Sequence, residues 1–156
     1  MAIHKIQIND FISTDYELIA IHSNLEDYRL AYFINQLLNI KLQKNSNAIE
    51  VSVLDSKSSF EHFIFDDEIQ DICWHLVENK SVLTTKQQTA SLFDNVDATI
   101  HLVPEFKKAD YILKVDNTDS FFDSDIVLKQ LSRIKFITMA YTINQDKLKS
   151  KNNLIF

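Results

Sequence analysis

The stretch ELIAIHSNLEDYRLAYFINQLL, from Glu17 to Leu38, contains the clearest strand and the clearest helix of the sequence. Glu17–His22 carries apolar residues at odd and even positions, which predicts a strand buried on both faces and therefore central in a sheet. Ser23 and Glu26 have the spacing of a capping box and predict the start of a helix that runs to about Leu38. The apolar residues of this helix predict one buried stripe, namely Leu30, Phe33, Ile34, Leu37 and Leu38, widened by Leu25, Tyr28 and Tyr32.

Segments rich in β-forming residues flank this unit. One short strand is predicted before it, at Ile3–Ile8, and four are predicted after it: Ile49–Leu54, Phe60–Asp66, Ile72–Val77 and Ala98–Val103. Asp66-Asp67-Glu68 is expected to form a hairpin turn, and the polar stretch Thr84–Asn95 a loop. Because the sequence contains no glycine, turn positions that need a left-handed backbone are expected to be Asn or Asp.

A further hairpin is predicted from Ala98 to Val115. Its register pairs Leu102 with Tyr111, Ile100 with Leu113 and Ala98 with Val115, which places all six side chains on one side of the sheet. This register leaves a four-residue loop, Glu105–Lys108, which suits these residues better than a two-residue Lys-Lys turn with positive φ.

The last part of the sequence predicts a helix and then a strand. The helix covers about Asp123–Ile134, and the apolar strand Phe136–Ile143 is expected to be central in the sheet. The order of elements is then two strands, a helix, about five strands, a helix and a strand. We therefore predict an α+β fold, with a mainly antiparallel sheet of about 6–8 strands and two helices packed on one face.

Composition excludes several classes of function. A chain of 156 residues is expected to form a single domain, 1–156. Without glycine it has no phosphate-binding glycine loop, dinucleotide fingerprint or nucleophile elbow. A net charge of −6, with Arg29 and Arg133 as the only arginines, argues against binding to duplex nucleic acid. One cysteine and no export signal favour a soluble cytoplasmic protein, and no apolar run is long enough to span a membrane.

The segment Val103-Pro104-Glu105-Phe106-Lys107-Lys108-Ala109-Asp110-Tyr111 resembles the signature of the IPExxxVDY family, small uncharacterised proteins of Bacteroidota. Val103 and Ala109 are conservative departures from that signature. The helix segment Ser23–Leu37 and the ending Leu148–Phe156 also resemble the family. The resemblance implies no activity, cofactor or catalytic residue, although members are often encoded beside ribonuclease III and acyl carrier protein.

The signature has a structural and a functional interpretation. In the structural one, Pro104 ends a strand, a carboxylate of Glu105 or Asp110 caps loop amides, and Tyr111 buries its ring. In the functional one, the loop formed by Glu105, Phe106, Lys107 and Lys108 contacts a partner, with Phe106 as an apolar anchor at a hairpin tip.

Histidine and cysteine give weak signals for a site. His62 and His75 can meet across the middle hairpin, with His101 beside them, but the histidines lack the spacing of a metal site. We therefore expect hydrogen-bonded sheet histidines, with no metal, no cofactor and no catalytic residue assigned. Cys73 lies two residues before His75, which would suit an activated thiol, although a buried and inert thiol is favoured. Asp66-Asp67-Glu68 is expected to be a solvated turn rather than a cation site.

The chain ends on three apolar residues, Leu154, Ile155 and Phe156. Exposing such side chains forgoes about 1.5–3 kcal/mol each. We therefore expect residues 147–156 to be a docking tail that binds this protein's own surface or a partner. The lysines Lys147, Lys149 and Lys151 are expected to stay solvated, where they can touch an acidic surface or an RNA backbone.

Three hypotheses for function remain. The leading one is a small, acidic, non-catalytic protein-interaction or adaptor module with a protein partner. The second is an accessory protein of RNA metabolism or the ribosome, which rests on the family context and on the lysines at 107, 108, 147, 149 and 151, and which the acidic pI disfavours. The third is a small-molecule enzyme that uses Cys73, His75 or a carboxylate pair brought together by the fold.

Overall fold

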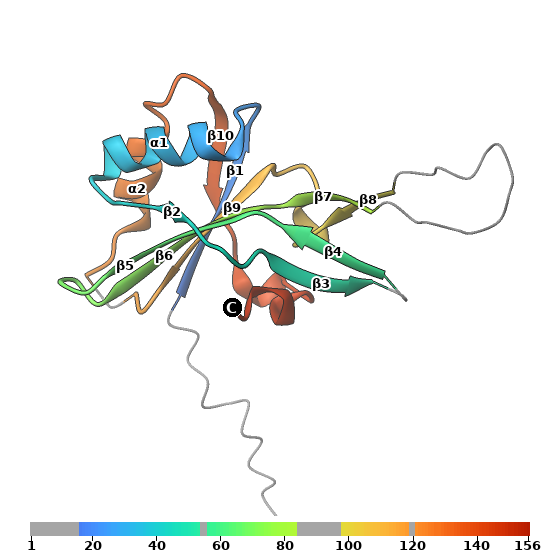
Figure 1. Ribbon diagram of the computed structural model, residues 1–156. Coiled ribbons are helices and arrows are strands. Elements are labelled where there is room, and N and C mark those ends of the chain that lie inside the picture. Colours follow the sequence, from blue (N-terminus) through green and yellow to red (C-terminus); the bar gives the residue numbers. More distant parts are fainter. Residues whose placement is uncertain (1–15, 54–55, 84–97, 119–120) are drawn as a thin grey trace, which may run out of the picture.

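The computed structural model describes residues 16–53, 56–83, 98–118 and 121–156 (Figure 1). The predicted strand Ile3–Ile8 and the predicted loop Thr84–Asn95 lie outside these ranges. The helices are α1 (Asp27–Leu38) and α2 (Ser124–Leu131). The strands are β1 (Tyr16–Ser23), β2 (Gln43–Lys44), β3 (Ile49–Val53), β4 (Ser56–Phe60), β5 (His62–Asp67), β6 (Ile72–Glu78), β7 (Lys80–Leu83), β8 (Ala98–His101), β9 (Tyr111–Asp116) and β10 (Ile137–Thr142). Short 3-10 helices are η2 (Pro104–Phe106), η3 (Gln145–Lys147) and η4 (Lys151–Leu154).

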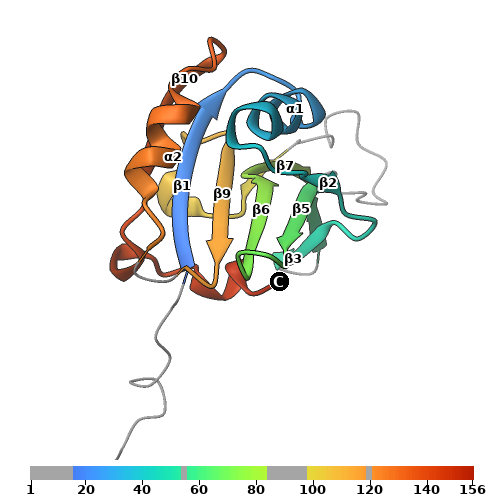
Figure 2. The same ribbon diagram turned by 90° about the vertical axis from the view of Figure 1, so that its left-hand side faces the viewer.

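The fold is α+β, as predicted, with a mainly antiparallel sheet. Its main sheet has six strands in the order β10-β1-β9-β6-β5-β2, and each neighbouring pair is antiparallel. Both helices cover one face of this sheet (Figures 1 and 2). The hairpin β3-β4, the pair β7-β8 and the C-terminal 3-10 turns lie on the other side (Figure 1). No helix in the described ranges is long and apolar enough to cross a bilayer.

The main sheet separates two apolar cores. On the helical side, Ile19, Leu113 and Leu76 pack against α1 and α2. On the other side, Leu18 and Ile112 pack with residues from the small hairpins and the C-terminal turns. The two-sided apolar pattern of Glu17–His22 therefore predicts its position correctly, because β1 lies between β9 and β10 and is buried on both faces.

The prediction that Phe136–Ile143 is central is wrong. Its strand, β10, forms the edge of the described main sheet and pairs only with β1 there. Ile137 and Ile143 are buried, but Met139 is more than half exposed. The apolar residues between them gave a false signal, because an edge strand also tolerates single exposed apolar side chains.

The predicted hairpin from Ala98 to Val115 is also wrong. β8 pairs with β7, and β9 has no free edge for it because β1 and β6 flank both sides of β9. Tyr111, Leu113 and Val115 face the helical core, whereas Ile100 and Leu102 belong to the opposite core. Residues 104–106 form η2 in place of a hairpin loop.

The start of α1 corrects the predicted capping box. The helix begins at Asp27 after Glu26, whose side chain makes no capping hydrogen bond to the helix. Ser23 is the last residue of β1, and its hydroxyl donates to the Phe136 carbonyl at 2.9 Å and accepts from the Leu25 amide at 3.2 Å. The Ser23 hydroxyl therefore joins β1 to the start of β10 and is not available to the helix.

The turns reflect the absence of glycine, and two strand boundaries differ from the prediction. Among described residues, positive φ occurs only at Asn39, Asp71 and Asn117, as predicted. The predicted strand Phe60–Asp66 is two strands, because β4 ends at Phe60 and β5 begins at His62. The following turn covers residues 68–71 rather than 66–68, because Asp66 and Asp67 still pair with Cys73 and Ile72.

The buried face of α1 predicts a large cost for one substitution. Leu30 is fully buried, whereas Phe33 is only partly buried and Tyr28 and Tyr32 are exposed, which narrows the predicted stripe. We expect Leu30→Ala to lower the free energy of unfolding by about 2–5 kcal/mol and Phe33→Ala by less than Leu30→Ala. Urea unfolding of both variants measures this, and an equal or larger loss for Phe33→Ala would show that the face is misassigned.

Candidate functional site

Four polar residues gather on the non-helical face of the main sheet, and their strands explain why. Antiparallel pairing places His75 of β6 opposite Lys114 of β9, and Cys73 opposite Asp116. His62 of β5 lies opposite Val77, one diagonal step from His75. Because alternate residues of a strand share a face, His62, His75, Lys114 and Asp116 form one cluster, which we call the histidine cluster.

A chain of hydrogen bonds connects the histidine cluster. Lys114 Nζ lies 2.7 Å and 2.8 Å from the two carboxylate oxygens of Asp116. His75 Nε2 lies 2.9 Å from Asp116 Oδ2, and His75 Nδ1 lies 3.0 Å from His62 Nε2. His62 Nδ1 in turn lies 3.2 Å from the side-chain amide nitrogen of Asn45. The chain therefore runs from a carboxylate through two imidazoles to an amide.

The pattern of hydrogen bonds in the histidine cluster determines which ring nitrogens carry protons. Asp116 accepts a hydrogen bond from Nε2–H of His75, so Nδ1 of a neutral His75 has a lone pair and accepts. His62 then donates from Nε2–H, and its own Nδ1 accepts from the amide of Asn45. Every bond has one donor and one acceptor while both imidazoles are neutral.

Burial and charge shift the ionisation of the histidine cluster. His62, His75 and Lys114 are 3%, 4% and 5% exposed. Burial, with smaller contributions from His75 and Lys114, lowers the pKa of His62 to about 4. Burial alone would raise the pKa of Asp116, but hydrogen bonds from His75 and Lys114 outweigh it and hold that pKa below its usual value. The cluster therefore favours a neutral His62 beside a Lys–Asp ion pair.

Aromatic rings and the end of the chain cover this cluster. Phe156 packs edge-on against the rings of His62 and His75, with ring centroids 5.2 Å apart in both cases. The ammonium of Lys114 lies 4.8 Å from the centroid of Phe156 and 5.2 Å from that of Tyr16. Leu154 is buried in the non-helical core, while Ile155 is 79% exposed. The tail thus lies against this protein's own surface through Leu154 and Phe156.

A pocket opens beside the histidine cluster. It has a volume of about 350 Å³, and Asn45, Ile49, His62, Ile64, Ile155 and Phe156 are among the residues that line it. In the described ranges, no group of three or more His, Cys, Asp or Glu residues is arranged to hold a metal ion. His101 lies on β8 and is not part of the cluster.

Cys73 faces the same side of the sheet but lacks the features of a nucleophile. It is partly exposed and lies opposite Asp66 and Asp116 on the two neighbouring strands. Burial and the nearby carboxylates raise the pKa of its thiol. A raised pKa leaves less thiolate at neutral pH, so the geometry gives no support for an activated cysteine.

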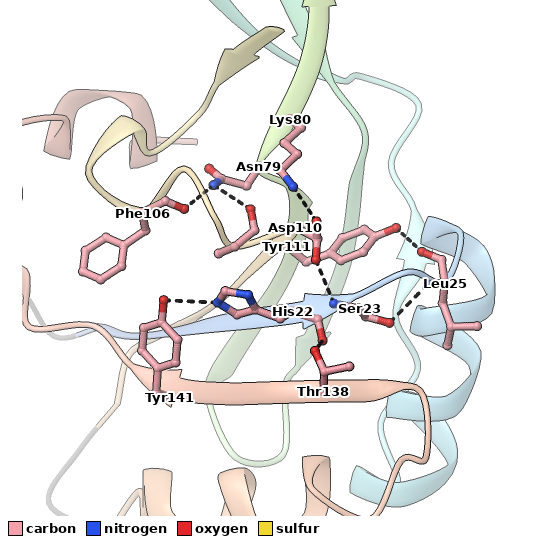
Figure 3. Close-up of polar contacts among 11 residues, drawn as sticks. His22, Ser23, Leu25, Asn79, Lys80, Phe106, Asp110, Tyr111, Thr138 and Tyr141 are labelled. Carbon is pink, nitrogen blue, oxygen red and sulfur yellow. Dashed lines mark hydrogen bonds and ion pairs between the residues drawn. The ribbon is translucent and has the colours of Figure 1, made fainter.

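The polar residues around the signature segment make structural contacts (Figure 3). Asp110 accepts from the Ser23 amide at 2.9 Å and binds Lys80 Nζ at 2.6 Å, and the Tyr111 hydroxyl donates to the Leu25 carbonyl at 2.6 Å. The fully buried Asn79 donates from its side chain to the carbonyls of Phe106 and Ala109, both at 3.0 Å. These contacts support the structural interpretation of Asp110 and Tyr111.

Glu105 connects the signature loop to the C-terminal tail. Its carboxylate accepts from the backbone amides of Lys149 and Ser150 and from the Ser150 hydroxyl. Phe106 is partly buried and packs against Tyr141, with ring centroids 6.1 Å apart. Lys107 and Lys108 are exposed. The predicted contact loop of Glu105, Phe106, Lys107 and Lys108 is therefore joined to the tail through Glu105 and is not the tip of a separate hairpin.

A second pocket, the Trp74 groove, lies at the helical side of the sheet. Its volume is about 470 Å³, and Leu38, Gln70, Trp74, Phe121, Phe122 and Ile126 are among its lining residues. Phe121 and Ile126 are 90% and 59% exposed. The indole nitrogen of Trp74 is buried and has no hydrogen-bond partner among the residues that the structure describes, which is uncommon for a buried donor.

Sequence reasoning found part of this arrangement. It anticipated the contact between His62 and His75, but it missed Lys114, Asp116, Asn45 and Trp74. One signal was available, because Lys114 interrupts the apolar strand Tyr111–Val115 and a lysine inside a doubly covered strand needs a buried partner. Asn45 comes from a distant segment and carries no comparable signal.

Comparison with known proteins identifies no protein family whose model matches this chain and no curated protein of similar sequence. The resemblance to the IPExxxVDY family therefore stays a prediction.

The lowered pKa of His62 predicts a pH-dependent stability. An unfolded imidazole takes up a proton near pH 6.5, whereas folded His62 does so near pH 4. Its contribution is fully present above about pH 6.5 and is lost as the pH falls toward about 4, because the unfolded chain binds the extra proton. The thermal midpoint of the wild type should therefore fall more steeply over this window than that of His62→Gln. Parallel curves would contradict the assignment.

Proposed function

We propose that the protein is a non-catalytic module that binds another protein through the Trp74 groove. The observation that carries this proposal is the aromatic groove itself, a pocket of about 470 Å³ beside Trp74 and Phe122 in which Phe121 and Ile126 are exposed. An apolar side chain of a bound segment would fill the groove, where Trp74, Phe122 and Ile126 supply apolar surface.

Charge favours a particular kind of partner segment. Gln70 lines the groove and belongs to the turn 68–71, which also contains Glu68 and Asp71. On the other side, Asp123 caps the start of α2 and Asp125 lies in its first turn. With a net charge of −6 for the whole chain, we propose that the partner presents an apolar residue next to lysine or arginine.

Other features of the proposal are carried over from the sequence. We propose a cytoplasmic location, because a single unpaired cysteine suits a reducing compartment. We also propose membership of the IPExxxVDY family on the sequence signature, in which Glu105, Asp110 and Tyr111 each make a structural contact.

Substitution at the groove tests the proposal. Ile126→Asp places a carboxylate at an exposed position in the groove and should weaken partner binding about tenfold or more without unfolding the protein. Val82→Asp is the matched control, because Val82 is similarly exposed on β7, away from the groove. Proteins recovered from native lysate by the wild type and by Val82→Asp, but lost with Ile126→Asp, would be the specific partners.

A direct measurement completes the test. Trp74 is the only tryptophan of the chain, so its fluorescence reports on the groove itself. Addition of a purified partner should shift the emission of the wild type and of Val82→Asp. Titration of the same partner into Ile126→Asp should show the lower affinity expected for that variant. Equal recovery of every partner by all three proteins, or an unchanged emission, would refute the proposal.

RNA binding is the second candidate, and one observation favours it. The contact of Glu105 with Lys149 and Ser150 brings two lysine-containing segments together. They contain Lys107, Lys108, Lys147, Lys149 and Lys151. If this surface binds RNA, the affinity should fall steeply as the salt concentration rises. The double variant Lys107→Ser and Lys149→Ser should lower the slope of log affinity against log salt concentration by the equivalent of about two phosphate contacts. The absence of a gel shift at low salt would exclude this candidate.

A further inference from the structure

The histidine cluster lies beside the 350 Å³ pocket, which shares no lining residue with the Trp74 groove. Burial of Lys114 with Asp116 and of two imidazoles carries a desolvation cost that an apolar set of similar volume would avoid. Groups of this kind, gathered at a pocket, are typical of functional sites.

The hydrogen-bond chain presents one acceptor at the pocket. Asp116 and Nε2 of His75 are bonded to each other, and Nδ1 of His75 is occupied by His62. His62 Nδ1 is the last acceptor, and its partner is the amide of Asn45 at 3.2 Å. His62 and Asn45 both line the pocket, so a ligand that enters it meets an acceptor and a donor side by side.

The charges of the site favour an uncharged ligand. Lys114 is neutralised by Asp116, and His62 is neutral at pH 7 because burial lowers its pKa to about 4. Glu50 also lines the pocket and disfavours an anion. Lys114, His62 and Glu50 therefore provide no unpaired positive charge for a phosphate or a carboxylate.

The remaining walls determine the shape of the ligand. Ile49, Ile64, Ile155 and Phe156 supply apolar surface around the polar pair. A volume of about 350 Å³ equals the space of roughly twelve water molecules at about 30 Å³ each. A single ring or a short branched chain fits this space.

We propose that this pocket binds a small uncharged alcohol or phenol, whose hydroxyl group inserts between His62 and Asn45. The hydroxyl donates to His62 Nδ1 and accepts from the side-chain amide of Asn45, so both groups stay paired. The apolar body of the ligand packs against Phe156 and Ile155. A hydroxyl fits better than an N–H group, which can only donate.

Phenol and anisole test the proposal, because they share one ring and differ in the ability to donate. Both are titrated into the isotope-labelled full chain, with the imidazole nitrogens of His62 observed by NMR. Phenol should bind about fivefold more tightly than anisole and shift the Nδ1 signal of His62. Equal affinities, no binding of phenol at millimolar concentration, or shifts centred on Trp74 would overturn the proposal.

Two variants separate this site from the proposed protein-binding function. His62→Phe keeps a ring and removes both nitrogens, so the preference for phenol over anisole should disappear. If His62→Phe does not fold, the shift of the Nδ1 signal in the wild type still shows whether phenol binds at His62. Ile126→Asp, in the Trp74 groove, should leave phenol binding unchanged. A preference that persists in His62→Phe, or that is lost in Ile126→Asp, would refute the assignment.

Discussion

The buried side chain of Asn79, between β6 and β7, holds the loop from β8 to β9 in place on the non-helical side of the sheet. Its amide donates to the carbonyls of Phe106 and Ala109, and its side-chain oxygen accepts from the Val103 amide at 2.8 Å. Its backbone pairs with Leu102 and Asp110. Because an unpaired buried amide would cost about 1–3 kcal/mol, this complete pairing determines the path of the loop from β8 to β9.

The position of this loop has consequences at both ends of β9. At its start, the loop places Asp110 and Tyr111 against the beginning of α1 and the end of β1. At its end, β9 carries Lys114 and Asp116 into the histidine cluster. β9 thus carries residues that hold the fold together at its start. At its end it carries a buried ion pair whose burial has a desolvation cost.

Prediction from the sequence succeeded where a local pattern determined the outcome. The apolar pattern of β1, the stripe of α1 around Leu30 and the left-handed Asn and Asp residues all follow from local rules. It failed where strand partners were chosen among distant segments. β8 pairs with β7 because β9 is already flanked on both sides, which no pattern within residues 98–115 reveals. The prediction of the candidate site was incomplete for the same reason, since Asn45 and Asp116 join the two histidines only through tertiary pairing.

The tail that covers the histidine cluster also makes this part of the molecule easy to open. From Leu148 onward the described chain forms only a 3-10 turn, held by Glu105, by a side-chain hydrogen bond from Asn153 to the Leu102 carbonyl, by the ring of Phe156 and by burial of Leu148 and Leu154. A segment with so few backbone hydrogen bonds belongs to the low-stability end of amide exchange, so it should detach as a unit long before the sheet unfolds. Ile155 and Phe156 form one wall of the pocket. Occupancy of that pocket and closure of the tail are then thermodynamically coupled, so that each favours the other by the same factor.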